Sequence, residues 1–367
     1  MTTGNDAGSL YQSLREHYAS MEPTLPRRRE ILQILELRFT PEEAELALRM
    51  PLRGQRGMSL GELESASGES RSQLEDMLGS MLKKGIAFSR QRREDGVETF
   101  LLWDLGYSMY TPTYGDGITD DQKRRLADLR ERLWQRGWPF VMFNSRHRVE
   151  RVLPFEEHID PSAEVVPYER FSHYVEQAQS ICVVACGCRA SSNRCNRPLY
   201  TCIHFDQETP YWVKYRGGRL LSKEECLSLM RDAVKSGLVI MGRNYQAQPN
   251  VVCMCCGDDC LLLRPYNESH YPYAFARSNF LADVDRAKCR GCLTCFNNCP
   301  VGAIQRRLSY QEGIRDGVLV LEERCIGCGV CTAVCPQQAI MLKKVRDIVP
   351  AETIREAWTR TIAERLW

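Results

Sequence analysis

Apolar and polar positions in residues 27–104 recur first at helical and then at strand spacing. Three capping boxes, each a Ser or Thr followed three residues later by Glu or Gln, predict helix starts at Thr40, Ser59 and Ser70. The last of these helices has five apolar residues on one face: Leu74, Met77, Leu78, Met81 and Leu82. Beyond Gly85, the runs IAFSRQ and ETFLLWD flank the turn REDG, which predicts a β-hairpin. With the apolar stretch RRREILQILELRF before Thr40, the pattern predicts helices followed by a hairpin.

This order of elements over residues 27–107, after an N-terminal arm at 1–26, resembles a winged helix-turn-helix domain. The resemblance implies DNA binding, but the charges argue against it. From Ser59 to Lys84, five acidic residues outnumber three basic ones, a net charge of −2 on the helix pair that would meet phosphate. The wing does carry Arg90, Arg92 and Arg93. We therefore expect a protein-docking or structural domain, with nucleic acid as the weaker alternative.

Residues 108–180 are expected to form a helical and strand connector. Turn signals in YTPTYGDGITD indicate a linker, followed by a charged helix, a strand and a helix in TDDQKRRLADLRERLWQRGW, RVERVLPFEEHI and YERFSHYVEQAQ. The next segment, 181–280, begins near the apolar strand SICVVA and contains the capped helix SKEECLSLMRDAVKSG. A C-terminal amphipathic helix is expected within residues 346–367. Its apolar stripe would pack on its own domain or dock to a partner: Ile354, Trp358, Ile362 and Leu366.

Composition indicates a globular chain and places the chemistry in its cysteines. The 367 residues are 43% hydrophobic and 26% charged, with a net charge of +2 that gives no general attraction to nucleic acid or membrane. Without a long apolar run or a leader-like N-terminus, we expect a cytoplasmic protein with no membrane span. All eighteen cysteines lie between Cys182 and Cys335. In a cytoplasmic chain, thiols clustered at short spacings indicate metal ligands.

Two cysteine runs near the C-terminus repeat one another. CRGCLTCFNNCP and CIGCGVCTAVCP each place four cysteines at spacings of two, two and three residues, close with proline, and are followed at the same distance by Ala-Ile. Small residues such as Gly291, Gly327 and Gly329 would let backbone amides approach the sulfurs. Zinc does not explain two complete four-cysteine runs. A long link between the runs is expected to form an extended hairpin that turns at EGIRDG.

These runs resemble the bacterial-type two-cluster ferredoxins over residues 281–345. The resemblance implies crossed ligation of two [4Fe-4S] clusters, each taking its fourth cysteine from the other run. One cluster would be held by Cys289, Cys292, Cys295 and Cys335, and the other by Cys325, Cys328, Cys331 and Cys299. Two such clusters can pass electrons from one to the other, but they do not themselves act on a substrate.

Two further cysteine groups lie in residues 181–280 and are expected to bind metal. They are Cys186, Cys188, Cys195 and Cys202, and, within VCMCCGDDC, Cys253, Cys255, Cys256 and Cys260. One or two more [4Fe-4S] clusters are the favoured interpretation, with zinc as the alternative. Cys182 and Cys226 are expected to be buried structural thiols. His204 is a candidate ligand, although a core or surface histidine is the favoured interpretation.

The segments CGCR, GRLLSKEE, SGLV and CMCCGDDC also resemble a family of larger iron-sulfur proteins, often from anaerobes, that join a winged helix to a two-cluster ferredoxin. That resemblance implies extra clusters and a place beside a redox enzyme. No nucleotide-binding loop or catalytic triad stands apart from the cysteines, so no catalytic residue is assigned.

The sequence thus predicts an α+β multidomain protein with a winged helix-turn-helix, a cysteine-rich α/β middle region and a two-cluster ferredoxin-like domain. We expect an electron-transfer subunit that relays electrons to or from a catalytic oxidoreductase subunit containing flavin, molybdenum or tungsten, or a redox carrier protein. The alternatives are a redox-responsive winged-helix transcription regulator and an iron-sulfur enzyme with a catalytic cluster in the middle region.

Overall fold

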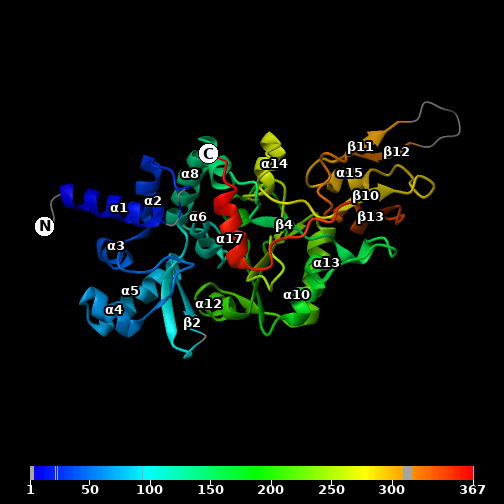
Figure 1. Cartoon of the computed structure of the whole chain (residues 1–367). Helices are drawn as coiled ribbons and strands as arrows, with labels where there is room; N and C mark the ends of the chain where they lie inside the picture. The colour runs from blue at the N-terminus through cyan, green and yellow to red at the C-terminus, as the bar shows by residue number, and fades with distance from the viewer. Residues whose placement is uncertain (1–3, 21, 23, 93, 309–315, 367) are drawn as a thin grey trace. The chain divides into compact units, whose positions relative to one another are not determined.

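Helices and strands are mixed along the whole chain in the computed structural model, which describes residues 4–20, 22, 24–92, 94–308 and 316–366 (Figure 1). The chain divides into two units, and each includes segments from distant parts of the sequence. The first unit comprises Met1–Met142, Val184–Ser192 and Gln207–Leu220. The second unit comprises Phe143–Val183, Asn193–Asp206 and Leu221–Trp367.

Helices dominate the first unit. The helices are α1 (Gly4–Ala19), α2 (Arg29–Arg38), α3 (Pro41–Ala47), α4 (Leu60–Ser67), α5 (Arg71–Lys84), α6 (Leu105–Ser108), α7 (Thr111–Tyr114), α8 (Asp121–Gln135), α9 (Trp138–Met142), α11 (Gly187–Ser192) and α12 (Thr209–Tyr215). The strands are β1 (Met58–Ser59), β2 (Ala87–Gln91), β3 (Glu98–Leu102) and β7 (Arg219–Leu220). The first three form a sheet in the order β1-β3-β2, and β2 and β3 are antiparallel.

The local signals in residues 27–104 led to the elements that they predict. Thr40, Ser59 and Ser70 cap α3, α4 and α5, each with the reciprocal bonds of a capping box. Four of the five residues on the apolar face of α5 are buried: Leu74, Leu78, Met81 and Leu82. The hairpin β2–β3 follows Gly85, whose left-handed conformation ends α5. The helices and hairpin are therefore confirmed, whereas the winged-helix assignment stays a prediction.

Two parts of the first unit differ from expectation. The N-terminal arm contains α1, which buries Tyr11, Leu14 and Tyr18. The expected linker around α7 is also part of the core, since Tyr110, Thr111, Thr113 and Tyr114 are buried. The reason is hydrogen bonding as well as packing: the buried Arg38 guanidinium donates to the Thr113 hydroxyl at 2.8 Å and the Gly85 carbonyl at 3.1 Å. The linker interpretation is wrong for this stretch.

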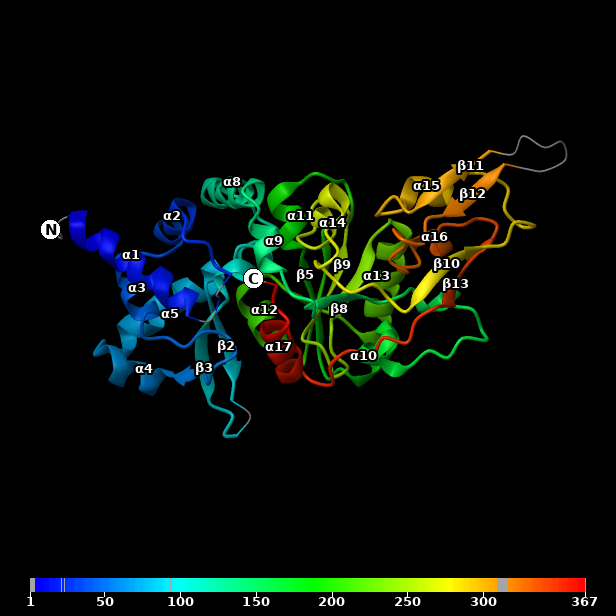
Figure 2. The ribbon, with the colours of Figure 1, turned by 45° about the horizontal axis from the view of Figure 1, so that its top comes forward.

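The second unit is built on a largely antiparallel sheet. Its strands follow the order β4 (Glu150–Val152), β8 (Val239–Arg243), β9 (Val251–Cys255), β6 (Tyr200–Phe205) and β5 (Ile181–Ala185), the last two residues of β5 belonging to the first unit. Two helices, α10 (Phe171–Gln177) and α13 (Lys223–Lys235), pack together beside the sheet (Figure 2). Ser222 forms the predicted capping box with Glu225 at the start of α13. The strands and helices expected in RVERVLPFEEHI, YERFSHYVEQAQ, SICVVA and SKEECLSLMRDAVKSG are confirmed by β4, α10, β5 and α13.

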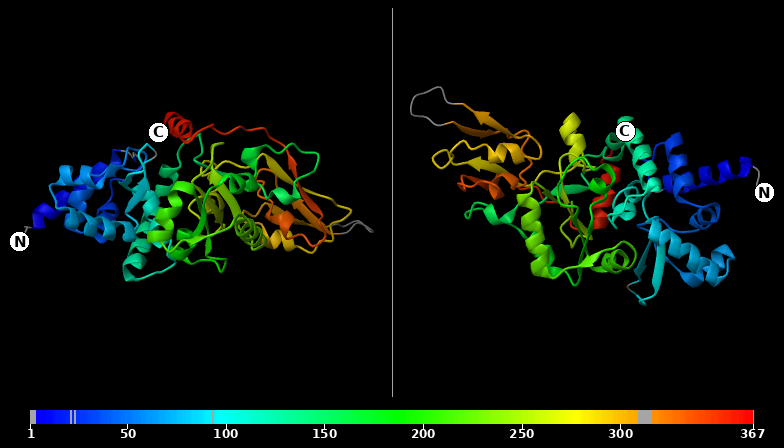
Figure 3. Two further views of the ribbon diagram at one scale, coloured as in Figure 1. Left: turned by 90° about the horizontal axis from the view of Figure 1, so that it is seen from below. Right: turned by 180° about the vertical axis from the view of Figure 1, so that it is seen from behind.

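The cysteine runs lie in two matching strand–helix–strand halves of the second unit. One half contains β10 (Phe280–Val284), α15 (Thr294–Asn298) and β11 (Ile304–Arg307), and the other β12 (Gly317–Val320), α16 (Val330–Ala333) and β13 (Ile340–Lys344) (Figure 3). The halves interlock because β10 pairs with β13 and β11 pairs with β12, both antiparallel. The expected hairpin is thus present at β11–β12, while most of its EGIRDG turn lies outside the described residues.

The remaining elements of the second unit are short helices and a terminal helix: η1 (Glu156–His158), η2 (Pro167–Glu169), α14 (Leu263–Ser269) and α17 (Ile354–Ala363), with η3 (Asp206–Glu208) at its boundary. In α17, Ala357 and Thr361 are buried, whereas Ile354, Trp358 and Ile362 are 53%, 50% and 60% exposed. The stripe therefore faces away from the core. Among the described residues, none of the helices has both the length and the apolar character to span a bilayer.

Candidate metal centres

The loops that carry the first three cysteines of each run have the same backbone. Two and four residues after the first cysteine, the chain adopts positive φ: 66° and 61° at Gly291 and Leu293, and 69° and 81° at Gly327 and Gly329. Glycine suits this conformation, and at Gly327 a Cβ would also lie 2.2 Å from the Phe280 carbonyl oxygen. The repeated turns explain why the sequence spacing recurs.

The sulfurs of the two runs are neighbours across the repeat. Burial, together with the nearby thiols of Cys335, Cys289 and Cys292, raises the pKa of Cys295 to about 11. In the other half, burial raises the pKa of Cys331 well above its ordinary value, and four thiols add to this effect: Cys328, Cys325, Cys299 and Cys295. The first three cysteines of each run therefore lie beside the fourth cysteine of the other run.

The fourth cysteine of each run accepts a hydrogen bond from the backbone. The amide of Ala303 lies 3.2 Å from the Cys299 sulfur, and the amide of Ala339 lies 3.3 Å from the Cys335 sulfur. These alanines are the residues that follow each Cys-Pro at the same distance in the sequence. Such amide donors stabilise thiolates and tune a bound metal centre.

The two ferredoxin thiol sets differ in exposure. Cys299, Cys325, Cys328 and Cys331 line a common cavity with apolar residues such as Ile304 and Leu342. The connector contacts the loop of this set, because the Phe155 amide donates to the Cys328 carbonyl at 3.0 Å. In the other set Cys292 is exposed, and hydrogen bonds from Thr294 lower its pKa. The set that contains Cys292 is therefore the more exposed of the two, although its Cys295 is buried.

Four of the middle cysteines form a connected set of thiols in the second unit. The sulfurs of Cys202 and Cys253 lie 3.5 Å apart, across the paired strands β6 and β9. Hydrogen bonds with Cys202 and Cys255 lower the pKa of Cys253, whereas those with Cys253 and Cys260 raise the pKa of Cys255. The contacts thus link Cys202 through Cys253 and Cys255 to Cys260. Thiols from both predicted groups take part.

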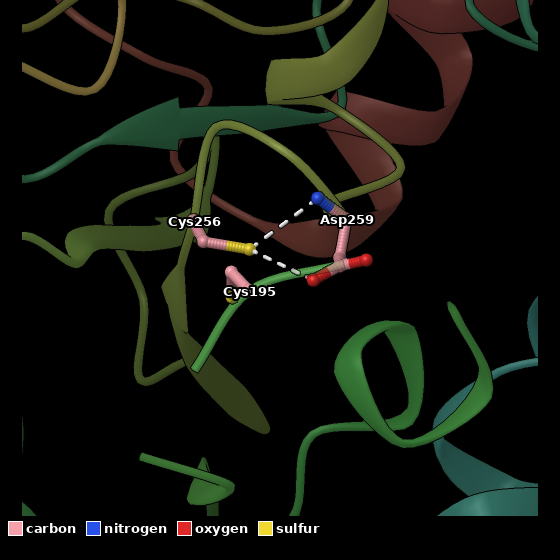
Figure 4. Close-up of side chains that lie close together, drawn as sticks. All are labelled: Cys195, Cys256 and Asp259. Atoms are coloured by element: carbon pink, nitrogen blue, oxygen red, sulfur yellow. Dashed lines mark hydrogen bonds between the residues drawn. The ribbon is translucent and has the colours of Figure 1, made fainter. Parts of the chain in front are cut away.

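Two other middle cysteines meet a carboxylate that sequence reasoning missed. One ligand atom each from Cys195, Cys256 and Asp259 all lie within 4.8 Å of one another (Figure 4). The Cys256 sulfur is 3.6 Å from Asp259 Oδ2, and it accepts a hydrogen bond from the Asp259 backbone amide at 3.4 Å. The two aspartates inside the CGDDC segment were the sequence signal that could have indicated a carboxylate ligand. The last two predicted ligands, Cys186 and Cys188, belong to the first unit, around the start of α11.

The remaining candidates have ordinary structural surroundings. Cys182 and Cys226 are fully buried, as expected, and burial raises the pKa of Cys226 to about 12. His204 is a buried residue of β6, and its Nε2 lies 3.6 Å from the Cys202 sulfur. It is therefore a core histidine beside the four connected thiols.

The arginines of the β2–β3 hairpin form ion pairs and hydrogen bonds within the protein. Arg92 pairs with Asp95 at 2.5 Å and lies 3.7 Å from Glu62. The hydrogen bond from Arg92 lowers the pKa of Asp95 to about 2. Arg90 donates to the Gln55 carbonyl at 3.2 Å, and Arg93 lies outside the described residues. The positive charge of at least one wing arginine is therefore partly neutralised by acidic side chains.

Comparison with known proteins identifies the region around the two interlocked halves. Residues 288–339 match the family model of the 4Fe-4S dicluster domain. A 56-residue segment, 15% of this chain, is 43% identical to the ferredoxin-type protein NapH of Haemophilus influenzae, of which it covers 19%. A 55-residue segment, also 15% of the chain, is 40% identical to a subunit of the ion-translocating oxidoreductase complex of Methanosarcina acetivorans, of which it covers 18%.

A third relative is the dihydromethanopterin reductase (acceptor) of Methanosarcina mazei, 40% identical over 60 residues, which are 16% of this chain and 23% of the relative. The chain thus spans less than a quarter of each of these relatives. The donors present fit iron-sulfur clusters: eight thiols in two neighbouring sets, with amides directed at two of the sulfurs. The chain carries a C-terminal ferredoxin domain of the 4Fe-4S dicluster type.

Proposed function

We propose that this protein is an electron-transfer subunit that relays electrons through [4Fe-4S] clusters to or from a catalytic oxidoreductase. The observation that carries the proposal is the proximity of the two ferredoxin thiol sets. Cys295 of one set lies close enough to Cys331 of the other to help raise its pKa. Clusters held by such adjoining sets can exchange an electron directly, since each accepts and releases one electron.

The ligands follow from the thiol neighbours. Cys289, Cys292, Cys295 and Cys335 would hold the more exposed cluster, and Cys325, Cys328, Cys331 and Cys299 the inner one. When bound, the clusters supply reversible one-electron chemistry. The protein's own contribution is to position eight thiolates, exclude water from the inner set, and donate amides to Cys299 and Cys335.

A route into the middle region begins at the inner set. Pro300, which follows Cys299, and Gly257, which follows Cys256, accept hydrogen bonds from the same Asn267 side-chain amide, at 2.9 and 3.1 Å. This contact supports a path that extends the ferredoxin wire toward the middle cysteines. Those cysteines would hold one or two further [4Fe-4S] clusters or zinc, and the connected thiols of Cys202, Cys253, Cys255 and Cys260 supply four thiolates for either kind of centre.

The partner would be a catalytic subunit with flavin, molybdenum or tungsten, or a redox carrier protein, in the cytoplasm. The names of two relatives, a member of an oxidoreductase complex and a reductase, support this class of partner. The helices and hairpin of residues 27–107 would serve as a winged-helix docking or structural domain rather than as a DNA reader. The exposed Cys292 loop is the natural point of electron exchange with the partner.

Anaerobic affinity isolation from the native host tests the role. We expect a catalytic oxidoreductase subunit to co-purify, and its cofactor to be reduced or oxidised through this protein in a reconstituted assay. Cys292→Ser should slow that exchange while leaving the complex intact. Recovery of the protein without any redox partner, bound to DNA, would contradict the proposal.

A further inference from the structure

Cys195, Cys256 and Asp259 form a compact group of donors in the second unit. They come from two loops, the one between α11 and β6 and the one after β9 (Figure 4). Cys256 and Asp259 are buried, with 1% and 5% of their surface exposed. A cation bound between the buried carboxylate and the two thiols would compensate the negative charge that these groups carry as metal ligands.

The carboxylate is held in a fixed orientation. The backbone amide of Arg194 donates to Asp259 Oδ1 at 3.1 Å, while Oδ2 faces the Cys256 sulfur at 3.6 Å. The Asp259 amide in turn donates to that sulfur at 3.4 Å. Supporting hydrogen bonds of this kind orient metal ligands and stabilise their anionic forms.

The spacing fits a single tetrahedral ion better than a cubane. With zinc–sulfur and zinc–oxygen bonds of about 2.3 and about 2.1 Å, a tetrahedral site places its sulfur and oxygen donors about 3.6 Å apart. That is the separation of Cys256 Sγ and Asp259 Oδ2. A cubane binds its cysteines at separate iron corners, which holds the sulfurs further apart. The mixed sulfur and oxygen donors also suit zinc, whereas iron-sulfur clusters take mainly thiolates.

We infer that Cys195, Cys256 and Asp259 bind one zinc ion, at a site distinct from the ferredoxin clusters. Three protein ligands leave a fourth position for water or another donor. The ion would join the loop before β6 to the loop after β9. The inference goes beyond the electron-transfer role and does not depend on it. A structural zinc ion would join these two loops whether or not the ferredoxin clusters transfer electrons.

Metal analysis of the full chain, purified without oxygen from cells supplied with both iron and zinc, tests this site. We expect about one zinc ion per chain, with a mixed sulfur and oxygen shell at the zinc X-ray absorption edge. Asp259→Asn should release zinc to a chelator roughly tenfold faster or more while the iron content stays unchanged. Asp258→Asn is the matched control, since Asp258 is the exposed neighbour of the same type.

The iron content reports separately on folding and on the ferredoxin clusters. Cys256→Ser provides a second variant, which should also lose zinc. Three results would overturn the inference: no zinc in the wild-type protein, equal zinc retention in Asp259→Asn and Asp258→Asn, or loss of iron rather than zinc from Asp259→Asn. A wild-type protein with zinc but little iron would leave the site standing and contradict the electron-transfer role.

Discussion

Gly257 lies directly against the carbonyl group of Pro300, so close that a Cβ at residue 257 would stand 2.4 Å from the Pro300 oxygen. The Asn267 side chain donates to both backbone carbonyls. Because Gly257 follows Cys256 and Pro300 follows Cys299, the contact joins the middle cysteines to the inner ferredoxin thiols. Only a glycine permits this approach.

Gly257→Ala should therefore weaken the junction. The added methyl group meets the Pro300 backbone as well as the Asn267 side-chain amide, so we expect a loss of about 1–3 kcal/mol in unfolding free energy. Electron transfer between the ferredoxin clusters and the middle region should slow as the backbones separate. Denaturant unfolding and rapid-mixing reduction under anaerobic conditions measure the two effects.

Gly79→Ala is the control for that substitution, because a Cβ at this position in α5 would meet nothing within 4 Å. It should stabilise the protein slightly, by about 0.5–1 kcal/mol, since alanine favours helix. Equal stability and equal transfer rates in Gly257→Ala and the wild type would show that the junction does not matter.

The two ferredoxin clusters should differ in their sensitivity to oxygen and chelators. The set with the exposed Cys292 should lose iron first, because solvent reaches its sulfurs, and the set with the buried Cys331 should lose iron later. Electron paramagnetic resonance during a timed exposure to air would resolve two phases. Cys292→Ser should remove the faster phase and Cys331→Ser the slower one. A single phase in the wild type would contradict the difference in exposure.

Glu22 should make stability depend on pH in the first unit. Burial, with Asp104 nearby, raises the pKa of Glu22 from 4.5 to about 8, although the Gly106 amide donates to its carboxylate at 3.0 Å. The folded state thus keeps a proton that the unfolded chain releases above pH 4.5. The stabilisation from protonated Glu22 is full below pH 4.5 and is lost as pH rises through about 8. Over this range the free energy of unfolding falls by up to about 1.4 kcal/mol per pH unit.

Glu22→Gln should flatten this dependence, so that the variant gains stability over the wild type between pH 5 and 8. Thermal unfolding followed by circular dichroism measures the difference, with Glu45→Gln, at an exposed position of α3, as control. Parallel pH profiles for the wild type and Glu22→Gln would mean that Glu22 ionises normally in the folded protein.

The hairpin should not bind DNA. Arg92 is committed to Asp95 and Glu62, and α4 and α5 carry a net negative charge. We expect no retention on heparin at low salt and no salt-dependent shift with duplex DNA. Asp95→Asn should raise retention slightly by releasing Arg92. Tight wild-type binding that weakens steeply with salt would favour the transcription-regulator alternative.

Local signals made much of the fold predictable. The capping boxes at Thr40, Ser59, Ser70 and Ser222 start helices because each is completed within four residues of chain. The repeated cysteine spacing likewise encodes a local turn, with positive φ at Gly291 and Gly327. These features need no knowledge of distant residues.

Features that depend on long-range contacts were missed. Asp258 and Asp259 are equivalent in sequence, and only the packing of two loops buries Asp259 beside Cys195. The tyrosines of the expected linker are buried because Arg38, 75 residues before Thr113, anchors that segment. In α17 the spacing of Trp358 identified an apolar stripe, but it could not reveal that the stripe faces away from the core.

Iron and acid-labile sulfide counting on the anaerobically purified protein, combined with a redox titration followed by electron paramagnetic resonance, tests the central claim most directly. We predict at least two [4Fe-4S] clusters per chain, about eight iron atoms or more, that are reversibly reduced and interact magnetically because their thiol sets adjoin. Iron at or below the content of one cluster, or two clusters that neither reduce reversibly nor interact, would contradict electron transfer through this domain.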